Sequence, residues 1–220
     1  MFFTRKKEGE AMSKKISGSY HQNSRVTSSL IDKTISILKA SGLPYYKCYD
    51  EQTSPHSFGE KLATAASDIF EKGIEKLIII GNDCPQLTTE ILNKAWLELE
   101  ENDMVIGPDK RGGIYLMGIS RKKFDQEEFM HLPWQTSNLF NETVMLCQLR
   151  SLSCKTLSTL YDINDFEDLK KVYWKLATDD QFTIFLKSLF LFETKIFGNQ
   201  IIASKLNDLF PGLRAPPVAA

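Results

Sequence analysis

The stretch that decides the fold is KLIIIG, residues Lys76 to Gly81. It is a short, continuous run of β-branched and apolar residues, which is typical of a central strand covered on both faces. The polar segment NDCPQL follows it directly. A helix is then predicted over Thr89 to Glu101, because Ile91, Leu92, Ala95, Trp96 and Leu99 recur at helical spacing.

Strands and helices alternate on both sides of this run. Further strands are predicted at Phe2 to Thr4, Tyr45 to Asp50, Asp103 to Pro108, Gly113 to Ile119, and in CKTLSTLYD, which begins at Cys154. Further helices are predicted from Ser24 to Ser41, from the SPHSF segment to Gly73, from Ser137 to Leu149, and from Asp165 onward. This alternation indicates an α/β protein with a mostly parallel sheet.

Length and charge set the domain count and exclude some partners. The 220 residues suit one large domain with an appendage. We expect an α/β domain over 1–178, a helical appendage packed on it over 179–210, and a flexible tail over 211–220. With 27 Lys+Arg and 28 Asp+Glu, the net charge of −1 gives no bulk attraction to nucleic acid or anionic lipid.

Two further patterns bear on location. The longest apolar stretch, Phe182 to Phe192, contains Lys187 and is about half the ~20 residues that a membrane span needs, so no span is expected. The four cysteines form no CxxC pair, and no secretory segment follows Met1. These observations predict a cytoplasmic protein with reduced thiols.

The first candidate site lies just after KLIIIG. In open α/β sheets, ligands bind at the carboxyl ends of the strands, where Asp83 would emerge. Its carboxylate could hold a divalent cation together with the oxygens of a nucleotide diphosphate. Alternatively, Asp83 only caps the following helix. A second candidate is VIGPDKRGGIYLMG, in which Gly112 and Gly113 allow either a ligand to approach the backbone or a tight turn.

The two segments together resemble a known family. GNDCPQL and, about twenty residues later, VIGPDKRGGIYLMG are similar to the patterns G-[ST]-D-C-P-x-L and G-P-x-x-D-G-G-[YF]-x-L-x-G of the selenodomain-associated transferases. SFGEKL, LPWQTS and YDINDFEDL match in order and spacing, so the likeness covers roughly half of the chain. The family belongs to the nucleotide-diphospho-sugar transferase superfamily, which also contains molybdenum-cofactor and 2-phospho-lactate guanylyltransferases.

The resemblance implies a fold and a set of site residues. The fold would be a three-layer, glycosyltransferase-A-like sandwich with a mixed, mostly parallel sheet. Asp83 would be catalytic and, with Asp162, would bind Mg²⁺ or Mn²⁺. Trp134 and Thr136 of the Trp-x-Thr segment would contact substrate, although an aromatic residue in an α/β protein is more often part of the core.

The chain also departs from the family pattern. Arg111 stands in place of the Asp of the D-G-G motif, where it either contacts a phosphate directly or marks an inactive site. The K-T-R-L phosphate loop of many relatives is absent, which leaves Arg5, Lys14 and Lys15 as candidate phosphate-binding cations or as a solvated basic face. Asp165, three residues before Asp168, is predicted to cap a helix.

These observations favour a transferase that binds a nucleotide or nucleotide-sugar and uses a small-molecule acceptor, with Asp83 and Arg111 as catalytic residues. The residues do not distinguish transfer of a sugar from transfer of a nucleotidyl group. Two alternatives stay open. One is a nucleotide-binding pseudoenzyme, for which Arg111 is the main argument. The other is a scaffold protein that uses the phenylalanine-rich helical appendage.

Overall fold

The computed structural model describes residues 1–17, 19–50, 56–173, 175–176 and 181–188. Two compact units, Met1–Val172 and Tyr173–Ala220, are distinguished, and each is considered by itself. In the second unit, residues 181–188 form a helix. The rest of the predicted appendage, 189–210, and the predicted tail lie outside the described residues, so the domain boundaries stay a prediction.

The first unit contains a six-stranded sheet in the order β2-β1-β3-β5-β4-β6. The strands are β1 Phe2–Thr4, β2 Lys47–Tyr49, β3 Lys76–Ile80, β4 Met104–Pro108, β5 Ile114–Ser120 and β6 Cys154–Thr156. β5 is antiparallel to its neighbours β3 and β4, and the other pairings are parallel. The mixed, mostly parallel sheet predicted from the sequence is thereby confirmed.

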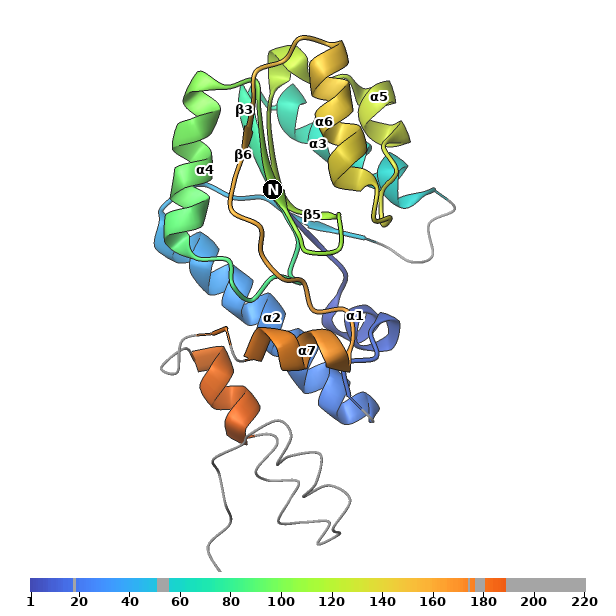
Figure 1. Cartoon of the computed structure of the whole chain (residues 1–220), viewed down its shortest axis with the longest axis vertical. Helices are drawn as coiled ribbons and strands as arrows, with labels where there is room; N and C mark the ends of the chain where they lie inside the picture. Colours follow the sequence, from blue (N-terminus) through green and yellow to red (C-terminus); the bar gives the residue numbers. More distant parts are fainter. Residues whose placement is uncertain (18, 51–55, 174, 177–180, 189–220) are drawn as a thin grey trace, which may run out of the picture. The chain divides into compact units, whose positions relative to one another are not determined.

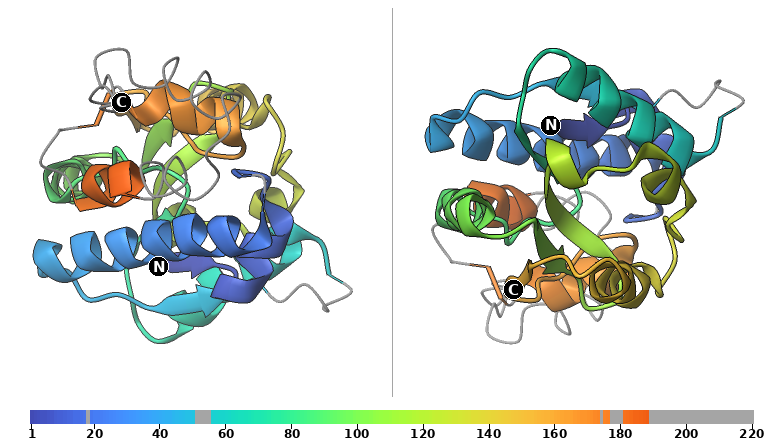
Figure 2. Two further views of the ribbon diagram at one scale, coloured as in Figure 1. Left: turned by 90° about the horizontal axis from the view of Figure 1, so that it is seen from below. Right: turned by 90° about the horizontal axis from the view of Figure 1, so that it is seen from above.

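Helices cover both faces of this sheet (Figure 1). The labelled α-helices are α1 Lys7–Ser13, α2 Tyr20–Ser41, α3 Phe58–Glu71, α4 Thr89–Glu101, α5 Gln126–His131, α6 Leu139–Leu149 and α7 Phe166–Tyr173, of which α2 to α6 pack on the sheet. One apolar core joins the sheet to α3, α5 and α6, and a second joins it to α2 and α4. In both views of Figure 2, the long α2 helix lies beside β1, the dark-blue strand next to the N-terminus.

The KLIIIG strand lies between the two cores. In β3, Leu77 and Ile79 belong to the core under α3, whereas Ile78 and Ile80 belong to the core under α2 and α4. All four side chains are buried. Each fully buried aliphatic side chain contributes about 1.5–3 kcal/mol of transfer free energy, so a strand that is apolar on both faces is stable only in the centre of such a sandwich.

Capping residues begin the helices on either side of this strand. Before α3, Ser57 and Glu60 form a capping box, in which the Ser57 hydroxyl accepts from Glu60 N and the Glu60 carboxylate accepts from Ser57 N. After β3, the Thr88 side chain accepts a hydrogen bond from Ile91 N at 3.3 Å and caps α4. Asp83 therefore does not cap α4, and its carboxylate is available for other contacts at the loop after β3.

None of the helices in the described ranges has the length and the apolar character that crossing a membrane requires.

Candidate functional site

A pocket with a volume of about 540 Å³ opens at the carboxyl ends of β1 and β3. The β4–β5 hairpin and residues 134–137 contribute further walls. Its lining is rich in charged and polar side chains, among them Thr4, Arg5, Glu10, Lys14, Asp50, Asn82, Asp83, Asp109, Arg111 and Asp162. The pocket lies at the end of the sheet where the sequence predicts a ligand, and Asp83 faces it as expected.

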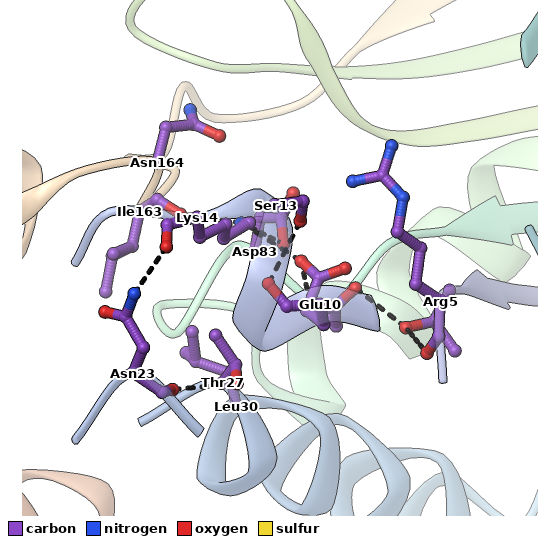
Figure 3. A network of polar contacts seen from close by, with 12 residues as sticks. Arg5, Glu10, Ser13, Lys14, Asn23, Thr27, Leu30, Asp83, Ile163 and Asn164 are labelled. Carbon is purple, nitrogen blue, oxygen red and sulfur yellow. Dashed lines mark hydrogen bonds and ion pairs between the residues drawn. The ribbon is translucent and has the colours of Figure 1, made fainter. Parts of the chain in front are cut away.

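Lys14 is the buried cation of this pocket. Its side chain is 8% exposed, and its ammonium lies 2.5 Å from Asp83 Oδ1 and 3.5 Å from Glu10 Oε1. It also donates a hydrogen bond to the main-chain oxygen of Ile163 at 2.7 Å. Figure 3 shows the lysine pointing toward these three oxygens, which come from α1, from the loop after β3 and from the connection to α7.

Buried hydrogen bonds connect Glu10, one of the two carboxylates that contact Lys14, to Asn82 and Thr4. Asn82 donates to Glu10 Oε1 at 3.4 Å and accepts from the Thr4 hydroxyl at 3.0 Å. Burial raises the pKa of Glu10, and the negative charge of Asp83 raises it further, whereas Lys14 opposes both effects. The sequence analysis assigned no role to Glu10, which belongs to no motif, or to Asn82, which lies within GNDCPQL but whose partners Thr4 and Glu10 are distant in sequence.

Asp162 also lines this pocket; the residue is partly exposed, but one of its carboxyl oxygens, Oδ1, is buried. Burial raises its pKa well above the ordinary value of 3.8, and the negative charges of Asp83 and Asp109 raise it further. Its buried Oδ1 receives no hydrogen bond from any residue that the structure describes. Ionisation of such a carboxyl group destabilises the folded protein. Carboxyl groups with strongly shifted pKa values are typical of functional sites.

We expect Asp162→Asn to weaken the decrease in stability with rising pH. A carboxyl group with a raised folded-state pKa contributes stability that is complete below its unfolded pKa, near 3.8, and is lost as the pH rises through the folded pKa. The variant cannot ionise, so its free energy of unfolding should exceed that of the wild type at pH 8. Urea denaturation at pH 5 and pH 8 measures this. The control is Asp32→Asn, at a side chain that is 61% exposed; equal pH slopes in all three proteins would contradict the prediction.

Arg111 lies at the pocket but is engaged by carboxylates. Its Nη2 is 2.8 Å from Asp168 Oδ1 and 3.1 Å from Asp165 Oδ2, and its side chain is half exposed. Hydrogen bonding to Asp165 raises the pKa of the guanidinium. Asp165 Oδ1 also accepts from Asp168 N at 2.9 Å, at the start of α7, as expected for the predicted cap. A phosphate role for Arg111 stays a prediction, since a ligand would have to share the guanidinium with these carboxylates.

Arg5 lies at the end of β1 and is held by Asp50. The Arg5 Nε donates to Asp50 Oδ2 at 3.1 Å, and Lys61 forms an ion pair with the other carboxylate oxygen. Asp50 is 6% exposed and follows β2, so the carboxylate bridges two neighbouring strand ends. This arrangement fixes the Arg5 guanidinium at the pocket through one nitrogen, and Asp50 is a third residue to which the sequence analysis gave no role.

The β4–β5 hairpin owes its shape to Asp109 and two glycines. The Asp109 Oδ1 accepts from Arg111 N at 2.6 Å and from Gly113 N at 2.9 Å. Gly112 has a φ of 87°, and a Cβ there would overlap the carbonyl oxygen of Ser137. Both glycines thus have a structural role, and of the two only Gly113 lines the pocket. Their predicted contact with phosphate stays a prediction.

The segment with the Trp-x-Thr pattern forms part of the pocket wall. Trp134 packs on Phe58 and Phe129 and donates its indole N–H to the Phe129 carbonyl at 2.8 Å, so much of its ring belongs to the core. Thr136 also lines the pocket and is exposed. Gln135 between them has a φ of 62°, a conformation that costs a non-glycine residue about 1–3 kcal/mol and is enriched at functional sites.

Like Gly112, Lys15 is a predicted site residue that does not line the pocket. Its side chain is exposed and is absent from the pocket lining. Its backbone instead forms an isolated parallel bridge with Asp165. Two neighbouring lysines of the same segment therefore differ completely in environment, with Lys14 buried and Lys15 in solvent.

The metal site expected at Asp83 and Asp162 does not fit a divalent ion in this arrangement. Asp83 already contacts the Lys14 ammonium, and a divalent ion on the same carboxylate would be repelled by it. Within the described ranges, no group of three or more His, Cys, Asp or Glu side chains is placed to hold a metal. No catalytic step is therefore assigned to a metal ion.

The middle of the chain is similar to a known protein family. Residues 38–136 match the family DUF2064, described as an uncharacterized protein conserved in bacteria. The resemblance predicted from the sequence is confirmed. The DUF2064 segment includes Asp83, Asp109 and Arg111, whereas Lys14 and Asp162 lie on either side of it. A comparison with curated proteins finds no significant match.

A solved structure shares the fold, and a second one is less similar. A proposed nucleotide-diphospho-sugar transferase from Desulfovibrio desulfuricans G20 superposes with a TM-score of 0.76 at 18% identity, covering 85% of this chain and 93% of that one. A manganese complex of Rv0371c from Mycobacterium tuberculosis H37Rv has a TM-score of 0.49 at 10% identity, with coverages of 80% and 97%. The first of these likenesses confirms the nucleotide-diphospho-sugar transferase fold; the second is too distant to inform the chemistry of this chain.

Proposed function

We propose that this protein is a transferase that binds a nucleotide or a nucleotide-diphospho-sugar in the pocket at the ends of β1 and β3. The observation that carries the proposal is the pocket itself, about 540 Å³ in volume, whose lining includes Arg5, Lys14 and Arg111 together with Asp83. This volume falls within the ~300–1,000 Å³ typical of small-molecule sites. Three fixed cations suit a ligand with a diphosphate group.

The proposed reaction transfers a sugar or a nucleotidyl group to a small-molecule acceptor. Negative charge then grows on the departing phosphate oxygens, and cations held in place before the reaction stabilise that charge without reorganising. Arg5 is held through its Nε by Asp50, and Lys14 is held through its ammonium by Asp83 and Ile163. Trp134 and Thr136 form the wall against which the rest of the ligand would lie.

A panel of nucleotides tests the binding part of this proposal. We expect nucleoside diphosphates and nucleotide-sugars to raise the melting temperature, because a ligand at a hundred times its dissociation constant stabilises the folded state by about 2.7 kcal/mol. Each ligand is measured with and without Mn²⁺, since the resemblance to transferases implies a divalent ion. Arg5→Gln should reduce the shift, whereas Asp32→Asn, at an exposed ion pair with Lys7, should not. Absence of any shift across the panel would contradict the proposal.

A pseudoenzyme that binds nucleotide without turnover is the second candidate. Two observations favour it: Arg111 is paired with Asp165 and Asp168, and Asp83 is paired with Lys14. Prolonged incubation with a nucleotide-sugar that the panel identifies separates the two candidates. Release of nucleoside diphosphate or monophosphate indicates an enzyme, and binding without release indicates a pseudoenzyme. The scaffold alternative depends largely on residues outside the described part of the chain.

The location of the protein also stays a proposal. All four cysteines are free thiols, as expected for the reducing cytoplasm that the sequence predicts.

A further inference from the structure

The Lys14 ammonium is enclosed by oxygens from three separate parts of the chain. An ammonium group has three N–H donors. Its three neighbours are Asp83 Oδ1 at 2.5 Å, the Ile163 carbonyl at 2.7 Å and Glu10 Oε1 at 3.5 Å. One carboxylate from a strand end, one carboxylate from a helix and one main-chain carbonyl form the kind of oxygen set that hard cations bind. In this protein the cation among these oxygens is the ammonium group of the Lys14 side chain.

The backbone of the same segment is also fixed. Asn23 of α2 donates its side-chain N–H to the Lys14 carbonyl at 2.5 Å. The next residue, Lys15, forms a backbone bridge with Asp165, and the following one, Ile16, is fully buried. Figure 3 shows Asn23 and Ile163 on one side of Lys14 and Glu10 on the other. The position of the ammonium is therefore determined by the fold, and it does not depend on the choice of a surface rotamer.

We propose that the Lys14 ammonium takes the place of a divalent cation, so that the pocket binds the diphosphate of its ligand without a metal ion. This inference rests on the proposed function, because it states how the same pocket accommodates a diphosphate. Lys14 neutralises Asp83, which would otherwise repel an approaching phosphate. The contact with Glu10 is the longest of the three, and a phosphate oxygen replaces it when the ligand enters.

Lys14 suits this role better than the other two cations. The Arg111 guanidinium is half exposed and is bound to carboxylates that follow β6, whereas Arg5 is bound to Asp50 after β2. Of the three, Lys14 alone contacts Asp83, the carboxylate that the sequence assigns to the metal. A divalent ion at Asp83 and the Lys14 ammonium exclude each other by charge repulsion, which makes the proposal testable with the metal alone.

The first experiment measures Mn²⁺ binding to the protein without nucleotide, by electron paramagnetic resonance of the free ion. We expect wild type and Lys15→Met to bind Mn²⁺ weakly and equally. Lys14→Met should bind it about tenfold more tightly or better, because Asp83 and Glu10 are then free to act as ligands. Lys15→Met is the matched control, since it removes the same charge from the adjacent, exposed position. Tight Mn²⁺ binding by the wild type would overturn the inference.

The second experiment measures nucleoside diphosphate binding by calorimetry in EDTA and in Mn²⁺. We expect the wild-type dissociation constant to be the same in both within about twofold, and that of Lys14→Met to be about tenfold higher in EDTA with recovery in Mn²⁺. A wild-type affinity that depends strongly on Mn²⁺ would overturn the inference and leave the proposed function standing. If the wild type binds no nucleotide at all, the proposed function fails, and the Mn²⁺ measurement still decides whether Lys14 occupies a cation site.

Folding of the variants is checked by circular dichroism. Lys14→Arg serves as a second variant that keeps the positive charge, and we expect it to exclude Mn²⁺ as the wild type does. If neither Lys14 variant folds, the two wild-type measurements remain decisive, because strong Mn²⁺ binding or Mn²⁺-dependent nucleotide binding in the wild type contradicts the inference by itself.

Discussion

Gly112→Ala is expected to lower the free energy of unfolding by about 2–5 kcal/mol. The left-handed φ of 87° costs an L-residue about 1–2 kcal/mol. In addition, the new Cβ would overlap the Ser137 carbonyl oxygen, and overpacking against rigid neighbours costs about 1–3 kcal/mol. The backbone there cannot move easily, because Phe140 N donates to the Gly112 carbonyl at 2.9 Å. Urea denaturation of the two proteins measures the difference.

Gly73→Ala is the matched control for this prediction. Gly73 has the same φ of 87°, but a Cβ at Gly73 meets no heavy atom within 4 Å. Its substitution should therefore cost only the conformational part, about 1–2 kcal/mol. The difference between the two variants isolates the contact with Ser137. Equal losses of stability would show that the hairpin moves away from residues 134–137 without cost.

Asp50→Asn is expected to lower the free energy of unfolding by about 3 kcal/mol, near the lower end of the range for breaking a buried ion pair. The carboxylate is almost fully buried and is shared by Arg5 and Lys61. The amide keeps the shape but not the charge, so two cations lose a common partner at the end of the sheet. We place the effect at the lower end because the Arg5 and Lys61 side chains are 25% and 18% exposed and can recover some hydration.

An exposed ion pair provides the comparison for Asp50. Lys7 and Asp32 are 2.8 Å apart with side chains 45% and 61% exposed, so Asp32→Asn should change stability by less than about 1 kcal/mol. A double-mutant cycle with Asp50→Asn and Arg5→Gln then measures the coupling between the two site residues. A coupling near zero would mean that Asp50 stabilises the fold through Lys61 alone.

The sequence predicts those elements whose buried face is apolar. KLIIIG, the helix after it and the helix before it all carry regular apolar patterns, and the structure has β3, α4 and α3 at these positions. The prediction failed to detect α1 and α5. In α1 the buried residues are Glu10 and Ala11, so the inward face is partly charged and has no apolar period. The α5 helix has only six residues, and Phe129 is the one that is buried. A helix this short cannot show a periodic apolar pattern.

The candidate site was predictable where it follows a strand and unpredictable where it depends on distant partners. Asp83 and Asp162 could be placed because the carboxyl ends of strands converge at one edge of a sheet. The different environments of Lys14 and Lys15 could not be predicted, because the pairing of Lys14 depends on an oxygen of Ile163, 149 residues away. For the same reason the sequence named Arg5, Lys14, Lys15 and Arg111 as candidate cations without distinguishing among them, whereas the structure brings Lys14 to Asp83.

The bond between Lys14 and Ile163 has a consequence for synthesis of the chain. Lys14 leaves the ribosome early, whereas the carbonyl that completes its surroundings is made 149 residues later. At ~5–20 residues per second, this interval is on the order of ten seconds. Until then the Lys14 ammonium lacks the Ile163 carbonyl, which is one of the three oxygens that surround it in the folded protein. A ligand that requires all three oxygens around the Lys14 ammonium can therefore stabilise the chain only after Ile163 has been synthesised.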